Sequence, residues 1–402
     1  MAVNYKSLLE HYQHDARQAN TWLGEALRKK QLKPTDFDFG RLFIECFGWH
    51  EFQECRDQGK LANHVFGQSL TEAAGAVSSF AFQTITANII SQVTIDAYES
   101  PEFVFTKQIP VRPTKLRTER IPGISGLGNE RQVVGENDPY PVAGVSEEWQ
   151  DTPIVRKYGF QVHVSREALF FDQSGILVDR ISKVAYWDAY AHELQAIDCV
   201  IDENTGAISG QLGGHRYNYK GDSIASYANN SGTHTFDNLQ ASNALLDYSD
   251  VENAELLFDA LNDPTTGVRT GAFRLAANQI IVPTGLLHTA KQLLNATEIR
   301  LHAGGYATTG SLYDRVSPNS LQAYQIVTSP LLSVQLATDT DWFAGNIGKA
   351  CEYIEAWPQE TKQAPSNDQD EFERDIVMKY RTSRMGAFHV RQPRFLVKST
   401  VA

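Results

Sequence analysis

The sequence predicts an α+β fold, and three features of the chain predict it. Residues 176–203 keep apolar side chains at helical spacing, which indicates one long helix. Two extended segments, 103–113 and 154–165, flank a turn-rich excursion of about forty residues, far longer than an ordinary hairpin loop. The chain closes on alternating strands within residues 372–399, interrupted once by Met385 and Gly386.

Composition limits what kind of protein this is. The 402 residues are enough for two or three domains or for one large elaborated domain, and 42% of them are hydrophobic, which supplies a core. The chain carries 36 basic and 48 acidic residues, a formal net charge of −12. This balance argues against a dedicated nucleic-acid binder, which shows a basic excess, but not against a protein that encloses nucleic acid.

Cysteine usage and the start of the chain indicate a reducing compartment. The four cysteines are scattered and predict free thiols: Cys46, Cys55, Cys199 and Cys351. His50 lies close to two of them, but a zinc site needs four ligands and no second pair follows. The polar segment 1–18 does not resemble a signal peptide, and no apolar run approaches the roughly 20 residues that cross a bilayer. We therefore expect synthesis in the cytoplasm and no membrane partner.

Residues 1–100 predict a helical arm. The first 60 residues indicate short helices with narrow apolar stripes, so we expect them to lie on another element. Their apolar positions include Leu8, Leu9, Tyr12, Trp22, Leu23, Ala26 and Leu27. A longer helix follows a capping box at Ser69–Glu72. Its single apolar face comprises Val77, Ala81, Ile85, Ile89, Val93 and Ala97.

Residues 101–166 predict an extended two-stranded loop. Residues 103–113 alternate like a strand, and so do residues 154–165, in which Tyr158 and Phe160 face away from Gln161. Such a long excursion would be disordered alone, so we expect something outside its own domain to hold it.

The strongest helical pattern spans residues 176–203. Ser174 can cap its start, and Asn204 with Gly206 can end it. At 1.5 Å per residue the helix would be roughly 40 Å long, a spine rather than a small-domain helix. Its predicted buried stripe is Leu177, Ile181, Val184, Trp187, Ala191, Leu194, Ile197 and Ile201. Residues 204–248, which are rich in Gly, Ser and Asn, predict loops with at most one short hairpin.

The next part of the chain indicates an α/β step. An amphipathic helix is expected at 249–261, capped by Ser249 or Asp250. Gln279–Val282 predicts a buried strand, which a proline stops before another helix. Residues 321–346 supply further strand-like runs.

The chain holds no complete catalytic motif. Gly123–Gly128 has its glycines in the wrong order for a dinucleotide loop, and no helix follows. His192 and Glu193 begin a zinc-protease motif, but Ala196 stands where the second histidine must ligate zinc. The acidic residues of 368–371 are most simply a solvated loop. We therefore predict no catalytic, cofactor-binding or metal-binding residue.

Five arginines mark the terminal strands: Arg374, Arg381, Arg384, Arg391 and Arg394. Guanidinium groups bind phosphates or carboxylates. With a net charge of −12, we expect these arginines to pair with carboxylates of neighbouring subunits rather than with phosphates.

Four segments occur in an order and spacing that resemble one known family. They are the phrase with Val162, Val164, Ser165, Glu167 and Leu169 before the spine helix, the strand-to-helix step 279–293, the turn and strand 341–357, and the terminal group Phe372, Arg384, Gly386, Val390, Pro393 and Phe395. Together they resemble the major capsid proteins of tailed bacteriophages, which share the Hong Kong phage capsid fold. The resemblance covers residues 70–400 and leaves 1–60 as a variable N-terminal arm.

The resemblance implies both an architecture and a function. Its parts would be an N-terminal helical arm (1–100), an extended loop (101–166), a peripheral domain with the spine helix (167–250), an α/β axial domain (251–345) and peripheral return strands (346–402). The protein would be a non-enzymatic virion component, made in the host cytoplasm, that self-assembles into pentamers and hexamers of an icosahedral head. The head would enclose double-stranded DNA without sequence specificity. Scaffold, portal and decoration proteins are the further partners that it suggests, and no cofactor is expected.

Some relatives join their subunits through a lysine–asparagine bond. Lys107, Lys115 and Lys157 lie on or near the extended loop and are the candidates here, although no motif identifies a partner. Two other interpretations stay open. One is the shell of a bacterial nanocompartment of the same fold, which would hold an enzyme instead of DNA. The other is a soluble α/β enzyme, against which the incomplete motifs count.

Overall fold

The structure is a computed structural model of the whole chain. It describes residues 8, 10–12, 16–34, 37, 39–47, 49, 73–122, 134, 136, 149–165, 176–203, 216–229, 236–262, 272–296, 298–301, 315–318, 324–336, 338–363 and 376–401. The chain divides into two compact units. Unit 1 comprises Met1–Pro101, Lys157–Tyr190 and Trp357–Met385, and unit 2 comprises Glu102–Arg156, Ala191–Ala356 and Gly386–Ala402.

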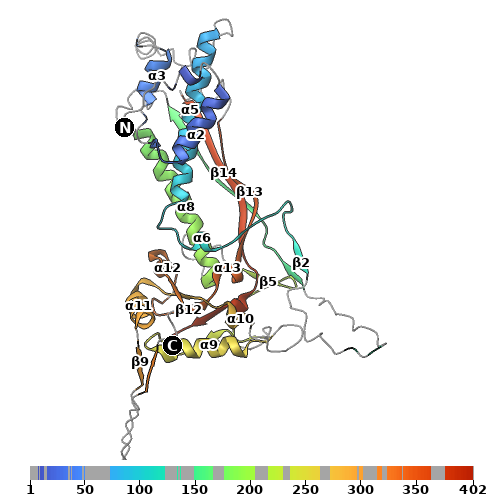
Figure 1. Cartoon of the computed structure of the whole chain (residues 1–402). Helices are drawn as coiled ribbons and strands as arrows, with labels where there is room; N and C mark the ends of the chain where they lie inside the picture. The colour runs from blue at the N-terminus through green and yellow to red at the C-terminus, as the bar shows by residue number, and fades with distance from the viewer. Residues whose placement is uncertain are drawn as a thin grey trace, which may run out of the picture. The chain divides into compact units, whose positions relative to one another are not determined.

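Helices and strands are mixed along the described chain, as Figure 1 shows. The helices are α2 (Ala16–Arg28), α3 (Phe39–Phe47), α5 (Ala73–Tyr98), α6 (Phe105–Gln108), α8 (Ile176–Ile201), α9 (Tyr248–Ala260), α10 (Ala272–Ala276), α11 (Leu287–Asn295), α12 (Pro330–Gln335) and α13 (Ile347–Ala350), with 3-10 turns η3 (Thr284–Leu286) and η5 (Pro393–Phe395). The strands are β1 (Val111–Pro113), β2 (Arg120–Pro122), β3 (Trp149–Asp151), β4 (Arg156–Ser165), β5 (Tyr217–Tyr219), β6 (Asp222–Ile224), β7 (Leu239–Gln240), β8 (Gln279–Ile281), β9 (Glu298–Leu301), β10 (Arg315–Pro318), β11 (Gln325–Val327), β12 (Trp342–Gly345), β13 (Cys351–Gln363), β14 (Ile376–Val390) and β15 (Leu396–Ser399). The predicted α+β class is confirmed.

Unit 1 contains the N-terminal helices. Both α2 and α3 pack against α5. Leu23 of α2, Leu42 of α3 and Ile85 of α5 are fully buried. The Asn88 amide of α5 donates a hydrogen bond to Asn20 of α2. The prediction that the short helices lie on another element is therefore confirmed, and that element is α5. Trp22, which the sequence placed in the apolar stripe, is instead half exposed.

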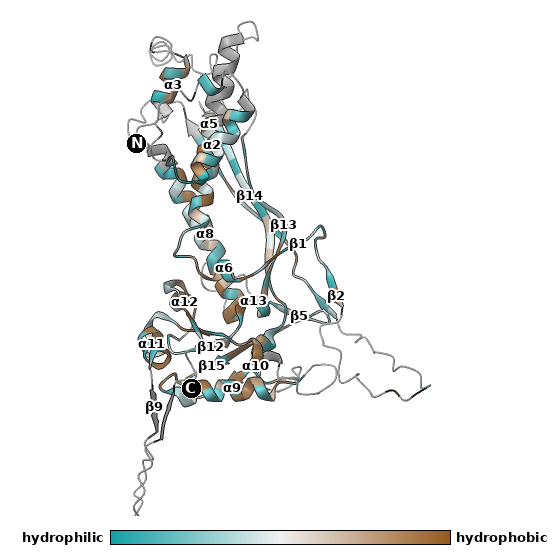
Figure 2. Cartoon of the chain, in the orientation of Figure 1, coloured by the Kyte–Doolittle hydropathy of each residue, from teal (hydrophilic) through white to brown (hydrophobic). Residues whose placement is uncertain are grey.

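The spine helix α8 is confirmed, but the predicted stripe is wrong at two positions. Val184 is 42% exposed and Trp187 is 62% exposed. The buried positions nearby are Ile181, Ala185 and Ala189, spaced by four residues. Two small alanines therefore continue the buried face, and the larger apolar side chains lie off it. Figure 2 shows hydrophobic and hydrophilic residues alternating along α8.

The segment 103–113 is only partly the expected strand. Val111–Pro113 forms β1, which pairs in parallel with β13, but Phe105–Gln108 forms the short helix α6. The N-cap residue of this helix is Val104, whose side chain makes no capping hydrogen bond. The cap comes from Glu193, a residue remote in sequence, which explains why local alternation predicted a strand.

A four-stranded sheet has the order β1-β13-β14-β4. In β4 the exposure of the side chains alternates over residues 157–163, as predicted. The predicted interruption at Met385 and Gly386 is wrong, because β14 is continuous through both. Gly386 is there for another reason: a Cβ at this position would lie 2.2 Å from the Tyr353 hydroxyl and 2.6 Å from the Ile354 carbonyl oxygen.

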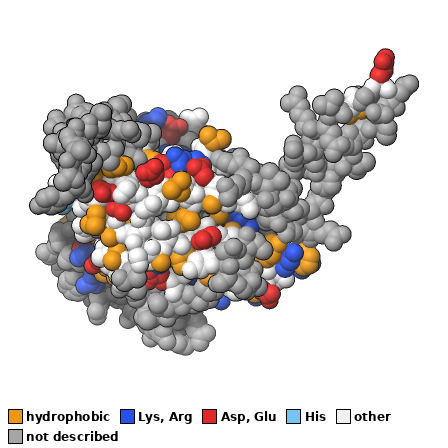
Figure 3. Space-filling view, turned by 90° about the horizontal axis from the view of Figure 1, so that it is seen from below, with side chains coloured by type: hydrophobic (Ala, Val, Ile, Leu, Met, Phe, Trp, Pro, Cys, Tyr) orange, Lys and Arg blue, Asp and Glu red, His pale blue; other side chains and the backbone are white. Residues whose placement is uncertain are grey.

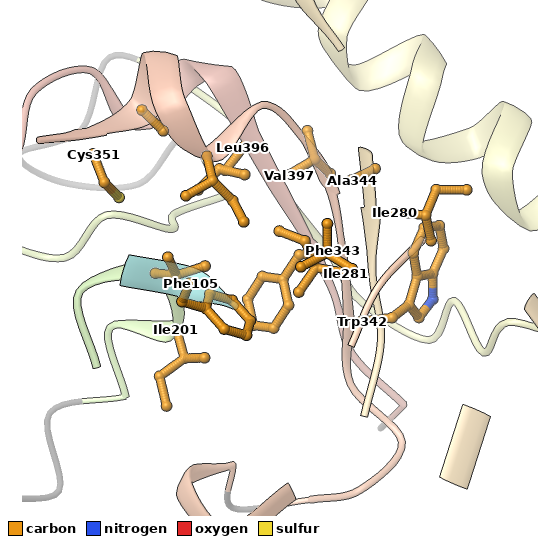
Figure 4. Packing of buried hydrophobic residues seen from close by; sticks show 14 of the residues in the cluster. Phe105, Ile201, Ile280, Ile281, Trp342, Phe343, Ala344, Cys351, Leu396 and Val397 are labelled. Carbon is orange, nitrogen blue, oxygen red and sulfur yellow. The ribbon is translucent and has the colours of Figure 1, made fainter. Parts of the chain in front are cut away.

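The core of unit 2 surrounds a five-stranded sheet of order β11-β8-β12-β15-β7. β8 pairs in parallel with β11 and antiparallel with β12, which matches the predicted strand-to-helix step before α11. The last strand of the chain, β15, pairs with β12 on one side and β7 on the other. Figure 4 shows Phe343 of β12 beside Ile281 of β8, and Trp342 of β12 beside Ile280 of β8. The Trp342 indole donates to the Asn243 carbonyl oxygen at 2.8 Å, so its buried N–H is satisfied.

The strand-like run predicted within 321–346 contains a helix. β11 and β12 form as expected, but Pro330–Gln335 is α12. Ser329 accepts a hydrogen bond from the Leu331 N–H, and Pro330 occupies the first turn. Both features favour a helix start, so they override the apolar alternation.

Helix α9 begins with a capping box that differs from the predicted cap. The Asp247 carboxylate accepts from the Ser249 N–H at 2.8 Å, and the Asp250 carboxylate accepts from the Asp247 N–H at 2.8 Å. The prediction of Ser249 or Asp250 as the cap is therefore wrong by two or three positions, although Asp250 takes part in the box.

Replacing Asp247 with alanine is expected to lower the free energy of unfolding by about 1 kcal/mol, because it leaves first-turn N–H groups of α9 without an acceptor. Urea unfolding of the unassembled subunit measures this. Asp247→Asn keeps an acceptor and serves as the control, and equal stability of the alanine and asparagine variants would contradict the assignment.

A small four-stranded sheet of order β2-β3-β5-β6 completes unit 2. The β5–β6 hairpin is the short hairpin that the polar region predicted. Its turn residues Lys220 and Gly221 both have positive φ, 53° and 94°, which suits a tight hairpin turn. A further hairpin, β9–β10, had no counterpart in the sequence prediction. None of the described helices is long and apolar enough to span a membrane.

Candidate functional site

The motifs tested on the sequence are not assembled into a catalytic centre among the residues that the structure describes. No group of three or more His, Cys, Asp or Glu side chains in those residues could hold a metal ion. Gly123–Gly128, residues 368–371 and Cys55 lie outside the described residues, as do the capping box Ser69–Glu72 and Arg374. The absence of catalytic, cofactor and metal residues stays a prediction.

Glu193 has a structural role that its motif context concealed. Its carboxylate is fully buried and accepts three backbone N–H groups, from Val104 at 2.8 Å, Phe105 at 2.7 Å and Thr106 at 3.0 Å. These are the free donors at the start of α6, so Glu193 caps this helix from α8.

The neighbouring His192 packs among aromatic rings. Its ring lies 5.0 Å from the Tyr353 ring and 4.8 Å from the Phe388 ring, centroid to centroid. His192 and Glu193 therefore serve packing and capping in unit 2 rather than metal binding.

The described cysteines are free thiols in apolar surroundings. Burial raises the pKa of Cys46 to about 12. Cys199 and Cys351 are both buried, and burial, together with the neighbouring Cys351 thiol, raises the pKa of Cys199 well above its usual value. A thiol with a raised pKa is a poor nucleophile at neutral pH, so neither Cys46 nor Cys199 is an activated nucleophile.

The predicted role of the terminal arginines is wrong for two of them. Arg384 is 5% exposed, and its guanidinium carbon lies 5.5 Å from the Tyr98 ring and 5.5 Å from the Tyr158 ring, all within unit 1. Arg394 is 2% exposed and lies 4.5 Å over the Phe236 ring in unit 2. Guanidinium groups stack favourably on aromatic faces. This explains why Arg384 and Arg394 can be buried although they carry a charge. Arg381 and Arg391 are exposed and remain open to partners.

A buried polar cluster lies where β1, β13 and β14 run together in unit 2. Glu352 Oε1 lies 3.4 Å from Arg112 Nε and 3.4 Å from His389 Nδ1. The histidine contact is longer than a good hydrogen bond. Burial lowers the pKa of His389 against the opposing pull of Glu352. Burial alone would raise the pKa of Glu352, but His389, Arg112 and Arg391 lower it overall.

These shifts predict a loss of stability in acid. The pKa of His389 is lowered in the folded protein, so the unfolded chain binds the extra proton more readily. The contribution of neutral His389 to the free energy of unfolding is complete above its ordinary pKa of about 6.5. It is lost progressively as the pH falls below that value. We expect the urea midpoint of the unassembled subunit to fall between pH 7 and pH 5.

The control for this prediction is His389→Gln, which removes the titrating group and should flatten the dependence over this window. Glu352 contributes only at lower pH, because its lowered pKa keeps it ionised until the pH falls below its ordinary value of about 4.5. An unchanged slope in the variant would assign the loss to other groups.

The base of the predicted loop forms a basic surface, which we call the loop stem and define as residues 111–120 and 149–156. It contains five basic and two acidic residues. Both acids are paired within it: Glu119 lies 3.4 Å from Arg112, and Asp151 lies 3.0 Å from Arg120. The remaining cations, Lys115, Arg117 and Arg156, are exposed. Val111, Leu116 and Ile154 are more than half exposed beside them.

An acidic surface lies on the helices of the same unit. We call it the α9 face and define it as residues 246–260 with Arg274 and Leu275. Residues 246–260 contain five acidic residues and no basic one. Arg274 of α10 pairs with Glu255 at 2.6 Å and with Asp259 at 3.6 Å, so one cation is shared by two of these acids. Leu246, Leu256 and Leu275 are exposed on this face, Leu275 to 90%. Seen from below, described hydrophobic side chains lie among charged ones (Figure 3).

The three lysines considered for a crosslink, Lys107, Lys115 and Lys157, are all exposed. Lys157 lines a shallow hollow of about 260 Å³ between β4 and β14 in unit 1, together with residues 158–161 and 381–383. This lining carries lysine and arginine but no carboxylate that could assist the bond. The lysine–asparagine crosslink stays a prediction.

Comparison with known proteins decides the family. The sequence model of the family described as phage capsid protein matches residues 150–399, more than half of this chain. The chain belongs to the phage capsid protein family. The predicted family is thereby confirmed, and this capsid protein is a structural component of a virion. No curated protein matches it.

Several solved structures are similar to the capsid protein. The capsid of an empty GTA particle shares 12% identity and a TM-score of 0.45, over 75% of this chain and 91% of that chain. Mycobacterium phage Patience shares 14% identity and a TM-score of 0.44, over 79% and 88%. The holo-SrpI encapsulin complex from Synechococcus elongatus PCC 7942 shares 9% identity and a TM-score of 0.41, over 75% and 88%.

Two features of the capsid protein went unnoticed in the sequence. The opposite charge of the loop stem and the α9 face could have been found in the sequence, because counting charged residues in short windows separates the two segments. The capping role of Glu193 has no such signal, because its partners lie almost ninety residues away and are backbone groups.

Proposed function

We propose that copies of this capsid protein assemble into pentamers and hexamers of an icosahedral phage head that encloses double-stranded DNA. The family match over residues 150–399 carries the proposal. A closed shell requires each subunit to present complementary surfaces to its neighbours. The loop stem and the α9 face, which differ in sign of charge, support such contacts.

The interior would hold DNA without reading its sequence. A net charge of −12 disfavours a dedicated nucleic-acid binder but is compatible with enclosing a genome. The function is structural, and no reaction is part of it. Synthesis in the host cytoplasm and contacts with scaffold, portal and decoration proteins belong to the same proposal.

The first test is the size of the assemblies that the purified full-length chain forms, measured by negative-stain microscopy and light scattering. Uniform shells tens of nanometres wide, or rings of five and six subunits, are expected. A monomer or small dimer at every concentration, with no assembly under crowding, would overturn the proposal.

The content of the particles separates a phage head from a nanocompartment. Particles recovered from phage-producing cells are treated with nuclease, and the protected nucleic acid and co-purifying proteins are identified. Protected double-stranded DNA supports the phage head. An enzyme in fixed proportion to the shell, with no protected DNA, would support the nanocompartment instead.

A further inference from the structure

The loop stem and the α9 face are opposite in charge but similar in composition. Each combines exposed charges of one dominant sign with three exposed aliphatic side chains. The surplus charges include Lys115 and Arg117 on the stem and Glu252 with the partly paired Asp259 on the face. Both surfaces belong to unit 2, and both stay exposed in the isolated chain. Neither surface therefore covers the other within one copy.

We propose that the loop stem of one copy docks on the α9 face of a second copy. This inference rests on the proposed assembly and names the contact that drives it. Leu116 lies between the two stem cations, and Leu256 lies between two acids at helical spacing, Glu252 and Asp259. Apolar contact supplies affinity, and the surrounding charges supply orientation and partner choice.

The pairing of two different surfaces allows rings. The stem and the α9 face are different surfaces, so the contact between two copies is head to tail and leaves one stem and one face free. The free stem and face can bind further copies until the ring closes. A self-complementary contact would instead stop at a dimer, because it uses the same surface on both copies.

Charge reversal tests the pairing directly. The stem variant is K115E/R117E, the face variant is E252K/D259K, and the swap variant combines all four substitutions. The concentration at which half of the subunits sediment as assemblies is measured for each. We expect each single-surface variant to raise this concentration at least about tenfold, because like charges would then face each other. The swap variant should return to within about threefold of the wild type, since opposite charges meet again at the four substituted positions.

Matched controls carry the same change in charge elsewhere. K183E/K362E matches the stem variant, and D179K/E360K matches the face variant. All four are exposed residues of unit 1, where Lys183 pairs with Asp179 and Lys362 pairs with Glu360. Assembly of these controls should stay near that of the wild type. Far-UV circular dichroism and the thermal midpoint check that every variant is folded.

Mixing shows that the contact joins separate copies. The substitutions change the stem from a net charge of +3 to −1 and the α9 face from −4 to 0, so neither variant should associate alone. The stem variant keeps the acidic face and the face variant keeps the basic stem, so an equal mixture should form complexes containing both. Association should also weaken as salt rises from 0.05 to 0.5 M, because exposed charges are screened.

The outcomes separate this inference from the proposed function. Wild-type assembly together with unaffected single-surface variants, no restoration by the swap, or no complexes in the mixture would overturn the inference and leave the capsid assembly standing. Failure of the wild type to assemble at all would overturn both.

Discussion

Replacing Gly345 with alanine is expected to destabilise the subunit by about 3–5 kcal/mol, the largest effect of any substitution considered. Gly345 has a φ of +144°, a conformation that side chains rarely adopt. A Cβ there would lie 2.0 Å from the Phe395 carbonyl oxygen and 3.0 Å from the Leu396 Cα. These are backbone atoms of the chain that enters β15, so they cannot turn aside as a flexible side chain could.

The hydrogen bonds around Gly345 make the clash costly to relieve. Gly345 faces Leu396 in the β12–β15 pair, its carbonyl oxygen accepts from the Asn278 N–H at 3.1 Å, and the Asn346 N–H donates to the Phe395 carbonyl oxygen at 2.9 Å. Moving either strand would break bonds in the centre of the five-stranded sheet. Urea unfolding of the unassembled subunit, with the yield of soluble protein, measures the loss.

Gly285→Ala is the matched control. A Cβ at Gly285 would meet only the Asp339 carbonyl oxygen at 3.8 Å, an ordinary contact, and its φ is not positive. The change should be neutral or slightly stabilising, because alanine restricts the unfolded chain. If the Gly345 and Gly285 variants lose similar amounts of stability, the close approach of β12 and β15 is not what requires glycine.

The sequence predicted elements whose information is local. The long helix α8, the strand β4 and the step from β8 to α11 each carry a periodic pattern and nearby start or stop signals, and each is present. The prediction missed helix α12 only because apolar alternation was given more weight than Ser329 and Pro330, which are also local signals. Such errors can be avoided from the sequence.

The remaining errors come from partners that are distant along the chain. Arg384 is buried because Tyr98 and Tyr158 lie beside it, and no local pattern distinguishes it from the exposed Arg381. Strand alternation placed arginines on both faces, but the sequence alone did not say which face had aromatic rings. The same applies to Trp187, whose exposure depends on what packs on α8.

The candidate assembly surfaces were partly visible in the sequence. The loop was expected to contact something outside its own domain, and the excess of acid over residues 246–260 is a local count. What required the structure was exposure: Leu116 and Leu275 are apolar residues that composition would place in a core, yet both extend into solvent.

Replacing Glu193 with glutamine is expected to lower the free energy of unfolding by about 2–4 kcal/mol. The carboxylate accepts three N–H groups at the start of α6, through Oε1 from Val104 and Phe105 and through Oε2 from Thr106. A glutamine keeps one acceptor oxygen and turns an NH2 group toward the third donor, so one buried N–H loses its partner and the remaining bonds lose their charge. Phe105 belongs to the core, so a displaced α6 would also disturb packing. Urea unfolding gives the magnitude, and hydrogen exchange at the amides of residues 104–106 locates it.

The control removes a carboxylate by the same isosteric change at an exposed position of the same helix. Asp179→Asn breaks the pair with Lys183, 2.8 Å away, in which both side chains are more than 60% exposed. Exposed pairs of this kind contribute about 0.3–0.5 kcal/mol, so the control should lose far less than Glu193→Gln and leave the exchange of residues 104–106 unchanged. A loss below about 1 kcal/mol for Glu193→Gln would mean that water or another group satisfies the α6 donors. Faster exchange at these amides with a large loss would show that a side chain of the spine helix holds α6 in place, just before the loop stem begins at Val111.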